Sequence, residues 1–395
     1  MESKINKHFC IQPFVHVTTR ILGQNNVCCN ISRNDSNIKE QSQVDFFNSK
    51  YVKDMREKLL KGEKIKDCSV CHSMEERSEN SHRREFNKYY YIENNKEHDY
   101  YQKIVKKLKL HQRKSPLYAE LHVSNLCNLK CLTCNEKDSS QFHAENKKLG
   151  ISQSANTDYT KFVVHTAKAV QNVLNKDLVY LDIRGGETLL VPEIKKVLQD
   201  ADPDITRRIS LKIQTNGTLL PDKGWLDIFR KFNKTKVNVS IDAYGEDNTY
   251  VRFPSDWQKI LQTLEKLKQE NIKFVINTVV SNINITVLHK LLRWVSKEKY
   301  LQYVYVLTDP YYLRPHNLPD TILADAAANL GQVRQLDYEN KNVNTIVDSL
   351  VKMCNNSDMT HFTRFLQEIK MRDKNRNNSI TQIVPQMKEY LDAKI

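Results

Sequence analysis

From Pro116 onward the sequence alternates between short apolar stretches and longer stretches with helical periodicity. Residues 256–269 show the helical pattern most clearly, because their apolar residues recur at intervals of three and four. Such an alternation predicts a parallel sheet whose strands are joined by right-handed crossovers. The predicted strands are 117–123, 178–184, 209–214, 236–241, 274–280 and 303–307, and the other predicted helices are 159–174 and 285–296.

This series predicts an α/β fold in the form of a partial (β/α)6 barrel, similar to a TIM barrel but short of eight units. Residues 1–115 hold five cysteines in two groups and show little sustained periodicity apart from 52–60. A segment of that kind needs a cross-link such as a metal site to be stable. Three domains are therefore expected: a cysteine-rich segment over 1–115, the barrel over 116–310 and a mostly helical region over 311–395.

The composition indicates a polar, soluble globular protein that stays in the cytoplasm. Hydrophobic residues make up 39% of the chain and the mean hydropathy is −0.62. No apolar run approaches the roughly 18 residues of a membrane helix, so no membrane contact is expected. The charged start MESKINKHF lacks the apolar region of a secretory signal. In a reducing compartment, nine cysteines, an odd number, indicate metal ligands or catalytic groups rather than disulfides.

The net charge of +14 allows two interpretations. Basic residues are concentrated in 53–114 and in 370–376, which would suit contact with RNA or DNA. A solvated lysine-rich surface explains the same charge, and no recognised nucleic-acid motif accompanies it. We favour the solvated surface.

Marked residues follow the predicted strands one after another. In parallel β/α folds the reactive groups lie at the carboxyl ends of the strands. The chain has only nine glycines, where average usage would give roughly 28, so each is expected where the backbone needs it. The residues at the five successive strand ends are the cysteines of 127–134, then Gly185, Gly186 and Glu187, then Thr215, Asn216 and Gly217, then Ser240 and Asp242, and finally Ser281 and Asn282.

The first of these strand ends carries the most specific motif. Cys127, Cys131 and Cys134 have the spacing Cys-x3-Cys-x2-Cys. Three thiolates at this spacing can hold three irons of a 4Fe–4S cluster, which four cysteines normally hold. The remaining iron is then open to a substrate or a cofactor.

With this triplet and the ordered strand ends, the chain resembles a radical S-adenosylmethionine (radical SAM) enzyme over about 118–310. The resemblance implies that Cys127, Cys131 and Cys134 are the catalytic cluster ligands and that SAM chelates the open iron. It implies reductive cleavage of SAM to a 5′-deoxyadenosyl radical, which abstracts a substrate hydrogen. The cluster and SAM carry this chemistry while the protein orients and shields it.

The resemblance also implies roles in binding SAM. Gly185 and Gly186 would allow the backbone to approach the methionyl group, and Glu187 would accept hydrogen bonds from its amine. An ordinary turn is the alternative for these three residues. Thr133 departs from the family pattern, in which an aromatic residue often precedes the third cysteine.

The remaining predicted cofactor-binding residues have structural alternatives of similar weight. Ser240 and Asp242 resemble the ribose-contacting positions of the family, although a helix N-cap pair would explain them equally well. Asn216 and Asn282 would contact SAM or shape its pocket, or serve only as turn residues. Tyr244, Tyr250 and Arg252 follow the fourth strand and either face the substrate or pack at the surface.

The amino-terminal cysteines are similar to the auxiliary-cluster segment of SPASM and twitch domains. This similarity places the chain near twitch-domain radical SAM proteins, many of them encoded by phages, and implies an auxiliary iron–sulfur domain over 1–115. The expected ligands of a second 4Fe–4S cluster are Cys10, Cys28, Cys68 and Cys71. A structural zinc site is the alternative, since spacing does not separate the two metals.

Three further residues bear on the metal sites. Cys29 adjoins Cys28 and is expected to be a bystander, although it could replace Cys28 as a ligand. His72 is a weaker candidate ligand next to Cys71. Cys354 is expected to be a buried thiol without a metal role.

A peptide or protein is the first expected substrate, because relatives with auxiliary clusters modify peptides, and a nucleotide or RNA is the second. A reductase, flavodoxin or ferredoxin is the expected electron donor. A zinc-stapled basic nucleic-acid-binding protein without catalysis would explain the charge and the amino-terminal cysteines. It would not explain the triplet. A degenerate scaffold that binds a cluster without chemistry is disfavoured by the intact Cys127, Cys131, Cys134 and Glu187.

Overall fold

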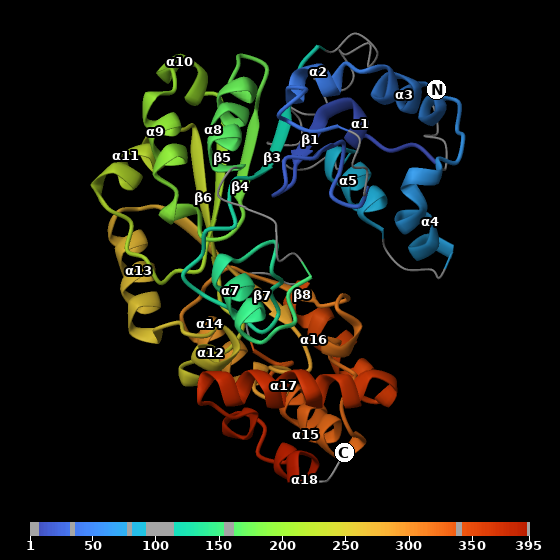
Figure 1. The fold of residues 1–395 in the computed structure, drawn as a ribbon, viewed down its shortest axis with the longest axis vertical. Coiled ribbons are helices and arrows are strands. Elements are labelled where there is room, and N and C mark those ends of the chain that lie inside the picture. The colour runs from blue at the N-terminus through green and yellow to red at the C-terminus, as the bar shows by residue number, and fades with distance from the viewer. Residues whose placement is uncertain are drawn as a thin grey trace. The chain divides into compact units, whose positions relative to one another are not determined.

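The computed structural model describes residues 8–31, 36–76, 81–91, 114–153, 162–336 and 342–392, which form two compact units (Figure 1). The first unit comprises Met1–Leu126, Asn156–Ile213 and Lys223–Thr235, and the second comprises Cys127–Ala155, Gln214–Asp222 and Lys236–Ile395. These units reflect compactness of the chain. The predicted domain boundaries after 115 and 310 stay a prediction.

The first unit contains a parallel sheet of four strands with one short antiparallel strand at its edge. The parallel order is β1 (His16–Thr19), β3 (Tyr118–His122), β4 (Tyr180–Arg184) and β5 (Ser210–Thr215), with β5 belonging to this unit up to Ile213. The short β2 (Asn25–Asn26) pairs antiparallel with β1.

Alternation along the strands separates two faces of this sheet. Ala119 and Leu121 of β3, and Leu181 and Ile183 of β4, are fully buried, and polar residues occupy the positions between them. Successive side chains of a strand point to opposite faces, so the apolar set forms one face. Helix α8 (Phe162–Val173) packs against β3 and against α9 (Pro192–Asp200), which in turn contacts α11 (Lys223–Lys231) (Figure 1).

The amino-terminal segment is more regular than its sequence suggests. Its helices are α1 (Gln12–Val15), α2 (Gln43–Phe47), α3 (Lys50–Leu60), α4 (Ser69–Glu76) and α5 (His82–Tyr91), with the 3-10 helix η1 at Lys66–Cys68. The periodicity over 52–60 is confirmed as α3, and the other helices form where the sequence shows little sustained periodicity. Strand β1 has only four residues, and they are buried by neighbours distant in sequence. Part of the basic stretch, 92–113, lies outside the described residues.

The second unit contains a smaller parallel sheet and most of the other helices. Strands β6 (Lys234–Ser240), β7 (Lys273–Val280) and β8 (Gln302–Val306) pair in parallel, with β6 and β7 paired from Lys236 onward. The predicted helix over 256–269 is α13 (Trp257–Gln269), capped by Asp256, and it packs against β7. The other helices before residue 310 are α7 (Ser140–Lys148), α12 (Glu246–Val251) and α14 (Leu288–Lys297).

The region after 310 is helical, as predicted. It contains α15 (Asp320–Gly331), α16 (Asn342–Cys354), α17 (Phe362–Arg376) and α18 (Met387–Asp392), with 3-10 turns at Tyr311–Leu313, Met359–His361 and Ile380–Gln382. Helix α17 buries an apolar stripe that includes Phe365 and Ile369. Its carboxyl-terminal turns also carry buried charges.

The predicted α/β class is confirmed, since each of the six predicted strands has a counterpart from β3 to β8. Closure into a partial barrel stays a prediction. Within the described residues, no helix is both long enough and apolar enough to span a membrane.

Candidate functional site

The cysteine triplet lies in the loop after β3, at the start of the second unit. Cys127 and Cys131 are buried together with Leu129, and the partly buried Cys134 packs against them. The amide of Cys134 donates to the carbonyl oxygen of Cys131 at 3.1 Å. The structure thus brings the three predicted ligands together in one loop.

The amino-terminal end of α7 holds this loop from one side. The hydroxyl of Ser139, the N-cap of α7, donates to the carbonyl oxygen of Leu129 at 2.6 Å. The amide of Cys127 donates to Oγ of Ser140 at 3.1 Å. Two serines therefore fix the backbone around the first cysteine, and a serine N-cap is a typical helix start.

Lys130, between the first two cysteines, connects the loop to distant parts of the unit. Its amide donates to the carbonyl oxygen of Phe253 at 2.7 Å, and its own carbonyl accepts from Nη2 of Arg376 at 2.7 Å. Arg376 also pairs with the buried carboxylate of Glu145 at 2.6 Å. Helix α17 therefore supports the triplet loop through a charged side chain.

The charge of Arg252 opposes the effect of burial on one thiol of the triplet. Burial raises the pKa of the Cys131 and Cys134 thiols, while the charge of Arg252 acts in the opposite direction on the pKa of Cys131. Arg252 is held by Asp242, with 2.7 Å between Nη1 and Oδ2. Thiolates are the form of cysteine that binds metals. Arg252 thus favours the form that a cluster requires.

The turn after β5 contacts the triplet loop directly. Nδ2 of Asn216 donates to Oδ1 of Asn128 at 2.8 Å, and Nδ2 of Asn128 donates to Oγ1 of Thr218 at 2.8 Å. Gly217 has a φ of +75°, and a Cβ there would lie 2.8 Å from a side-chain carbon of Val239. Asn216 thus helps to position the loop, and its predicted contact with SAM stays a prediction.

Asp242 is buried at the carboxyl end of β6, and both of its carboxylate oxygens have partners. Oδ1 accepts from the amide of Val279 at 2.8 Å, and Oδ2 accepts from Arg252. Asp242 is not the N-cap of the following helix α12, because Gly245 occupies that position. Asp242 therefore ties β6 to β7 and holds Arg252, and a ribose contact stays a prediction.

Ser240 and Asn282 also have protein partners. Oγ of Ser240 accepts from Nε2 of Gln214 at 3.4 Å. Asn282 is buried, and its Nδ2 donates to the carbonyl oxygens of Tyr312 and Asn317 at 2.9 and 3.3 Å. These bonds organise the loops after β5 to β7, and the predicted contacts of both residues with SAM remain untested.

The residues after β6 that were considered for substrate contact pack within the second unit. Tyr250 is buried and donates to Oδ1 of Asp373 on α17 at 2.8 Å. Tyr244 is 40% exposed and its ring packs against those of Trp257 and Trp294. Surface packing accounts for Tyr244, but it is wrong for Tyr250, whose ring is buried.

The Gly185-Gly186-Glu187 turn lies in the first unit and holds the segment that leads into the triplet. The amide of Glu187 donates to the carbonyl oxygen of Leu126 at 2.7 Å, and Cys127 is the next residue. A Cβ on Gly186 would lie 2.3 Å from that same oxygen, and one on Gly185 would lie 2.8 Å from the carbonyl oxygen of Ser124. Both glycines also have positive φ, +104° and +53°.

The structure therefore gives these glycines a role beyond the predicted one. Because they have no side chains, they allow the 124–126 segment to approach the turn closely. This role is independent of the predicted approach of SAM. The side chain of Glu187 is buried and caps the 3-10 helix η4 (Thr188–Leu190) by accepting from the amide of Leu189 at 3.1 Å. Its predicted bond to the amine of SAM stays a prediction.

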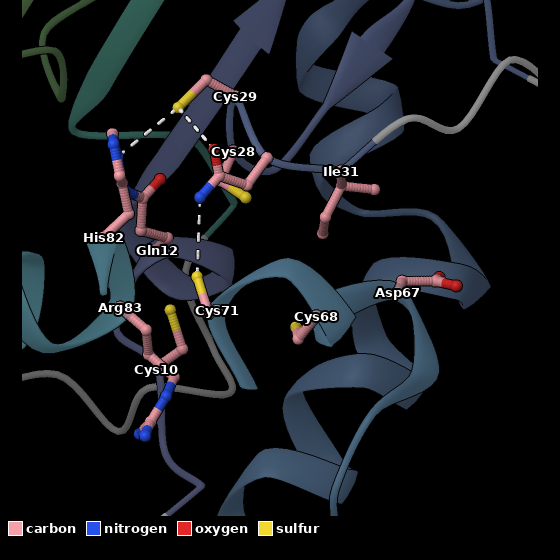
Figure 2. A pocket seen from close by; sticks show the side chains of 11 residues that line it. Cys10, Gln12, Cys28, Cys29, Ile31, Asp67, Cys68, Cys71, His82 and Arg83 are labelled. Carbon is pink, nitrogen blue, oxygen red and sulfur yellow. Dashed lines mark hydrogen bonds between the residues drawn. The ribbon is translucent and has the colours of Figure 1, made fainter. Parts of the chain in front are cut away.

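Four amino-terminal cysteines gather around one pocket of the first unit. In Figure 2 the sulfur atoms of Cys10, Cys28, Cys68 and Cys71 point toward a common space between η1, α4 and the start of α1. The pocket contains about 370 Å³ of empty space, part of it open to solvent. The predicted set of auxiliary ligands thus lies together although it spans some sixty residues of sequence.

The pKa values reflect how close these sulfurs lie. Burial, with a smaller contribution from neighbouring cysteines, raises the pKa of Cys10 to about 12 and that of Cys68 to about 11. Burial and the charges of Cys29, Cys10 and Cys68 raise the pKa of Cys28 well above its usual value. A cation such as a metal ion or cluster would lower these pKa values and release the protons.

Cys29 differs from its four neighbours. It also borders the pocket, but its sulfur turns toward His82, with 3.7 Å between Sγ and Nδ1 (Figure 2). Burial raises the pKa of Cys29 to about 11, and its main charged neighbours are Glu120 and Arg184. This orientation supports its interpretation as a bystander of the auxiliary site.

His72 and Cys354, the other two residues considered for the metal sites, lie outside them. The ring of His72 packs edge-on against that of His8 at 5.3 Å, and His72 does not line the pocket. Cys354 is 4% exposed and lines no described pocket, as expected of a buried thiol. Across the described ranges, no three His, Cys, Asp or Glu side chains are arranged around a single metal position.

A set of charged residues that the sequence reading missed lies on β3, β4 and β5. Glu120, Asp182, Arg184 and Lys212 occupy the face opposite to the buried apolar residues. The signal in the sequence was a charged residue at every second position of an otherwise apolar strand, as in LVYLDIR. That pattern also suits a solvated sheet face, so the sequence alone did not single it out.

Comparison with known proteins bears on the region that contains the triplet and the glycine turn. Residues 121–295 match the model of the radical SAM superfamily. GTP 3′,8-cyclase of Clostridium perfringens is 25% identical over 166 residues, which are 41% of this chain and 46% of the cyclase. An uncharacterized protein of Methanocaldococcus jannaschii is 31% identical over 183 residues, 44% of this chain and 56% of that protein. The chain thus spans about half the length of the curated relatives it matches.

Solved structures show weaker similarity. SuiB of Streptococcus suis is 14% identical, with a TM-score of 0.38 over 85% of this chain and 70% of that one. A structure described as native anSMEcpe with bound AdoMet is 20% identical, with a TM-score of 0.37 over 54% of this chain and 59% of that one.

The family match supports the resemblance predicted from the triplet. Residues 121–295 are similar to the radical SAM superfamily, and the relatives named as cyclases are enzymes. The enzyme class and the association with iron–sulfur and SAM chemistry are thereby supported at the level of the superfamily. The twitch or SPASM subtype and the phage origin remain predictions.

Proposed function

We propose that this protein is a radical SAM enzyme whose catalytic 4Fe–4S cluster is held by Cys127, Cys131 and Cys134. The observation that carries the proposal is that these cysteines, inside the matched segment, gather in one buried loop. When bound, the cluster and SAM supply a 5′-deoxyadenosyl radical that abstracts a hydrogen atom from the substrate.

The residues of the chain prepare this site before any cofactor binds. Ser139, Asn216 and Arg376 fix the loop by hydrogen bonds, and Arg252 favours the thiolate at Cys131. Positioned groups of this kind reduce the reorganisation needed on binding. The proposed SAM-binding set consists of Gly185, Gly186, Glu187, Asn216, Ser240, Asp242 and Asn282.

We further propose a second 4Fe–4S cluster in the amino-terminal pocket, held by Cys10, Cys28, Cys68 and Cys71. Four cysteines saturate a cluster of this type, and the shared pocket supports the assignment. Zinc held by the same thiolates is the alternative.

The proposed substrate is a peptide or protein, and the proposed electron donor is a reductase, flavodoxin or ferredoxin. The amino-terminal cysteine set supports this choice through its similarity to the auxiliary domains of peptide-modifying relatives. A nucleotide substrate is the second candidate. It is favoured by the similarity to GTP 3′,8-cyclases and by the net charge of +14.

The experiment is anaerobic reconstitution followed by iron, sulfide and zinc analysis and a 5′-deoxyadenosine assay with dithionite and SAM. The wild-type chain should carry about eight irons, two clusters of four, and should form 5′-deoxyadenosine. The variant with Cys127, Cys131 and Cys134 changed to alanine should keep about four irons and form none. Cys354→Ala is the matched control and should behave as wild type.

Two results would contradict the proposal. Formation of 5′-deoxyadenosine by the triple variant would remove the triplet from catalysis. Zinc together with the iron of a single cluster would overturn the auxiliary iron–sulfur assignment and leave the catalytic one intact.

A further inference from the structure

The polar face of the first-unit sheet is arranged in three rows, which run across the strands. Strand register places Tyr118 beside Tyr180, Glu120 beside Asp182, and His122 beside Arg184, and it extends the middle row to Lys212. The first row is aromatic, with 4.8 Å between the ring centres of Tyr118 and Tyr180. The middle and last rows carry the charges. We call Glu120, His122, Asp182, Arg184 and Lys212 the charged face.

The charges of this face are paired through two carboxylates. Asp182 accepts from Nη2 and Nε of Arg184, and from Nζ of Lys212 at 2.9 Å. Glu120 lies 3.3 Å from Nε2 of His122 and 3.7 Å from Nη2 of Arg184. Buried carboxylates held in this way remain ionised. The paired cations lower the pKa of Asp182 and of Glu120 against the opposing effect of burial.

The acidic side chains of the charged face are less exposed than its basic side chains. The side chains of Asp182 and Glu120 are 0% and 8% exposed, whereas those of Arg184, Lys212 and His122 are 26%, 18% and 27% exposed. A ligand that approaches this face therefore meets the cations first. Arg184 contacts protein carboxylates through its Nε and Nη2 atoms. Among the described residues, no such contact involves its Nη1 atom. A guanidinium with an unused edge is well suited to a planar carboxylate.

The charged face is continuous in sequence with segments of the proposed site. His122 and Arg184 are the last residues of β3 and β4, and the segment leading to the triplet and the glycine turn follow them directly. Ligands of parallel sheets bind at this end of the strands. On the other side, the charges of Glu120 and Arg184 act on Cys29, which borders the auxiliary pocket. The face is thus adjacent, within the first unit, to the cysteine cluster.

We propose that the charged face binds a carboxylate of the peptide substrate through Arg184, Lys212 and His122. This inference rests on the proposed function and narrows its substrate to peptides with an acidic side chain or a free carboxyl terminus near the reacting residue. Two carboxylates, Asp182 and Glu120, balance the charges of Arg184 and Lys212. A single carboxylate suits such a balanced site, whereas a nucleoside triphosphate would bring several negative charges against Glu120 and Asp182.

The test measures binding to the reconstituted full chain in the presence of SAM. The probes are a pool of short blocked peptides with one fixed glutamate among uncharged residues, the matched pool with glutamine, and GTP. The glutamate pool should bind about tenfold more tightly than the glutamine pool, as expected for one charge-assisted hydrogen bond. Arg184→Gln should remove this preference, and Arg207→Gln, at an arginine whose side chain is 74% exposed in the same unit, should keep it.

Arg184→Gln leaves Asp182 short of a partner and can impair folding, so a second variant is needed. His122→Gln combined with Lys212→Gln keeps the pair of Arg184 and Asp182 and should reduce the preference severalfold with the fold intact by circular dichroism. Equal binding of the two peptide pools to the wild type would overturn the inference. GTP binding that is lost in either variant would overturn it in favour of a phosphate site.

Formation of 5′-deoxyadenosine without peptide is measured on the same samples. Its absence in the wild type contradicts the proposed function itself. Its presence together with equal binding of the two pools contradicts only the carboxylate site.

Discussion

Replacing Glu145 by glutamine should destabilise the second unit, because this buried carboxylate links the triplet loop to α17. Arg376 pairs with it at 2.6 Å, Arg372 at 2.8 Å and Lys130 at 3.2 Å, and its side chain is 0% exposed. Removing one partner of a buried charged group typically costs about 3–5 kcal/mol, since the remaining charges stay buried. The variant removes the carboxylate that pairs with Arg376 and leaves Arg372 paired with Glu368.

The pKa of Glu145 gives an independent magnitude. Burial alone would raise this pKa, but Arg376, Lys130 and Arg372 lower it from 4.5 to about 2. A shift of that size corresponds to about 3 kcal/mol of stability. Because the folded pKa is depressed, this contribution is present above pH 4.5 and is lost as the pH falls toward 2. The cost of removing a buried charged partner and the stability derived from the pKa shift therefore agree in size.

The assay is urea unfolding of the metal-free chain, followed by tryptophan fluorescence between pH 7 and pH 2.5. Trp257 and Trp294 report on the second unit. Glu145→Gln should lower the free energy of unfolding by about 3 kcal/mol at pH 7, and this difference from wild type should shrink as the pH falls from 4.5 to 2.5. Glu265→Gln, on the exposed side of α13, is the matched control and should change it by less than about 0.5 kcal/mol. A variant with wild-type stability and an unchanged acid transition would refute the reasoning.

Other predictions concern the turns and the thiols. Gly186→Ala places a Cβ 2.3 Å from the carbonyl oxygen of Leu126. This variant should form no 5′-deoxyadenosine although it retains its bound iron. The control Gly331→Ala has open space around its Cβ and should stay active. Wild-type activity in Gly186→Ala would show that the close approach is dispensable. Cys68→Ala should lose about four irons and Cys29→Ala none; iron loss in the Cys29 variant would make that residue an auxiliary ligand.

Much of the sheet could be predicted from the sequence because its strands have simple patterns. Alternating or continuous apolar residues located β3 to β8, and Asp256 marked the start of α13. Strand β1 was missed because its four residues, HVTT, contain a single aliphatic side chain. Its burial comes from pairing with β3, a contact across about a hundred residues that local pattern cannot show.

The candidate site was predictable in part for the same physical reason. Spacing located the triplet, since its cysteines are near one another in sequence. The pocket of Cys10, Cys28, Cys68 and Cys71 came from resemblance alone, and only the fold shows that Cys29 turns away from it. The charged face escaped notice because Glu120 and Asp182 looked like residues of a solvated strand. Their burial and their partners depend on strand register.

The central claim is that the triplet holds a cluster with an iron open to SAM. The most direct measurement is the electron paramagnetic resonance spectrum of the dithionite-reduced protein before and after addition of SAM. The account predicts that SAM changes the signal of one cluster in the wild type, and that this signal is missing when Cys127, Cys131 and Cys134 are alanine. A spectrum in which SAM changes no cluster signal, or a SAM-responsive signal that survives in the triple variant, would contradict the account.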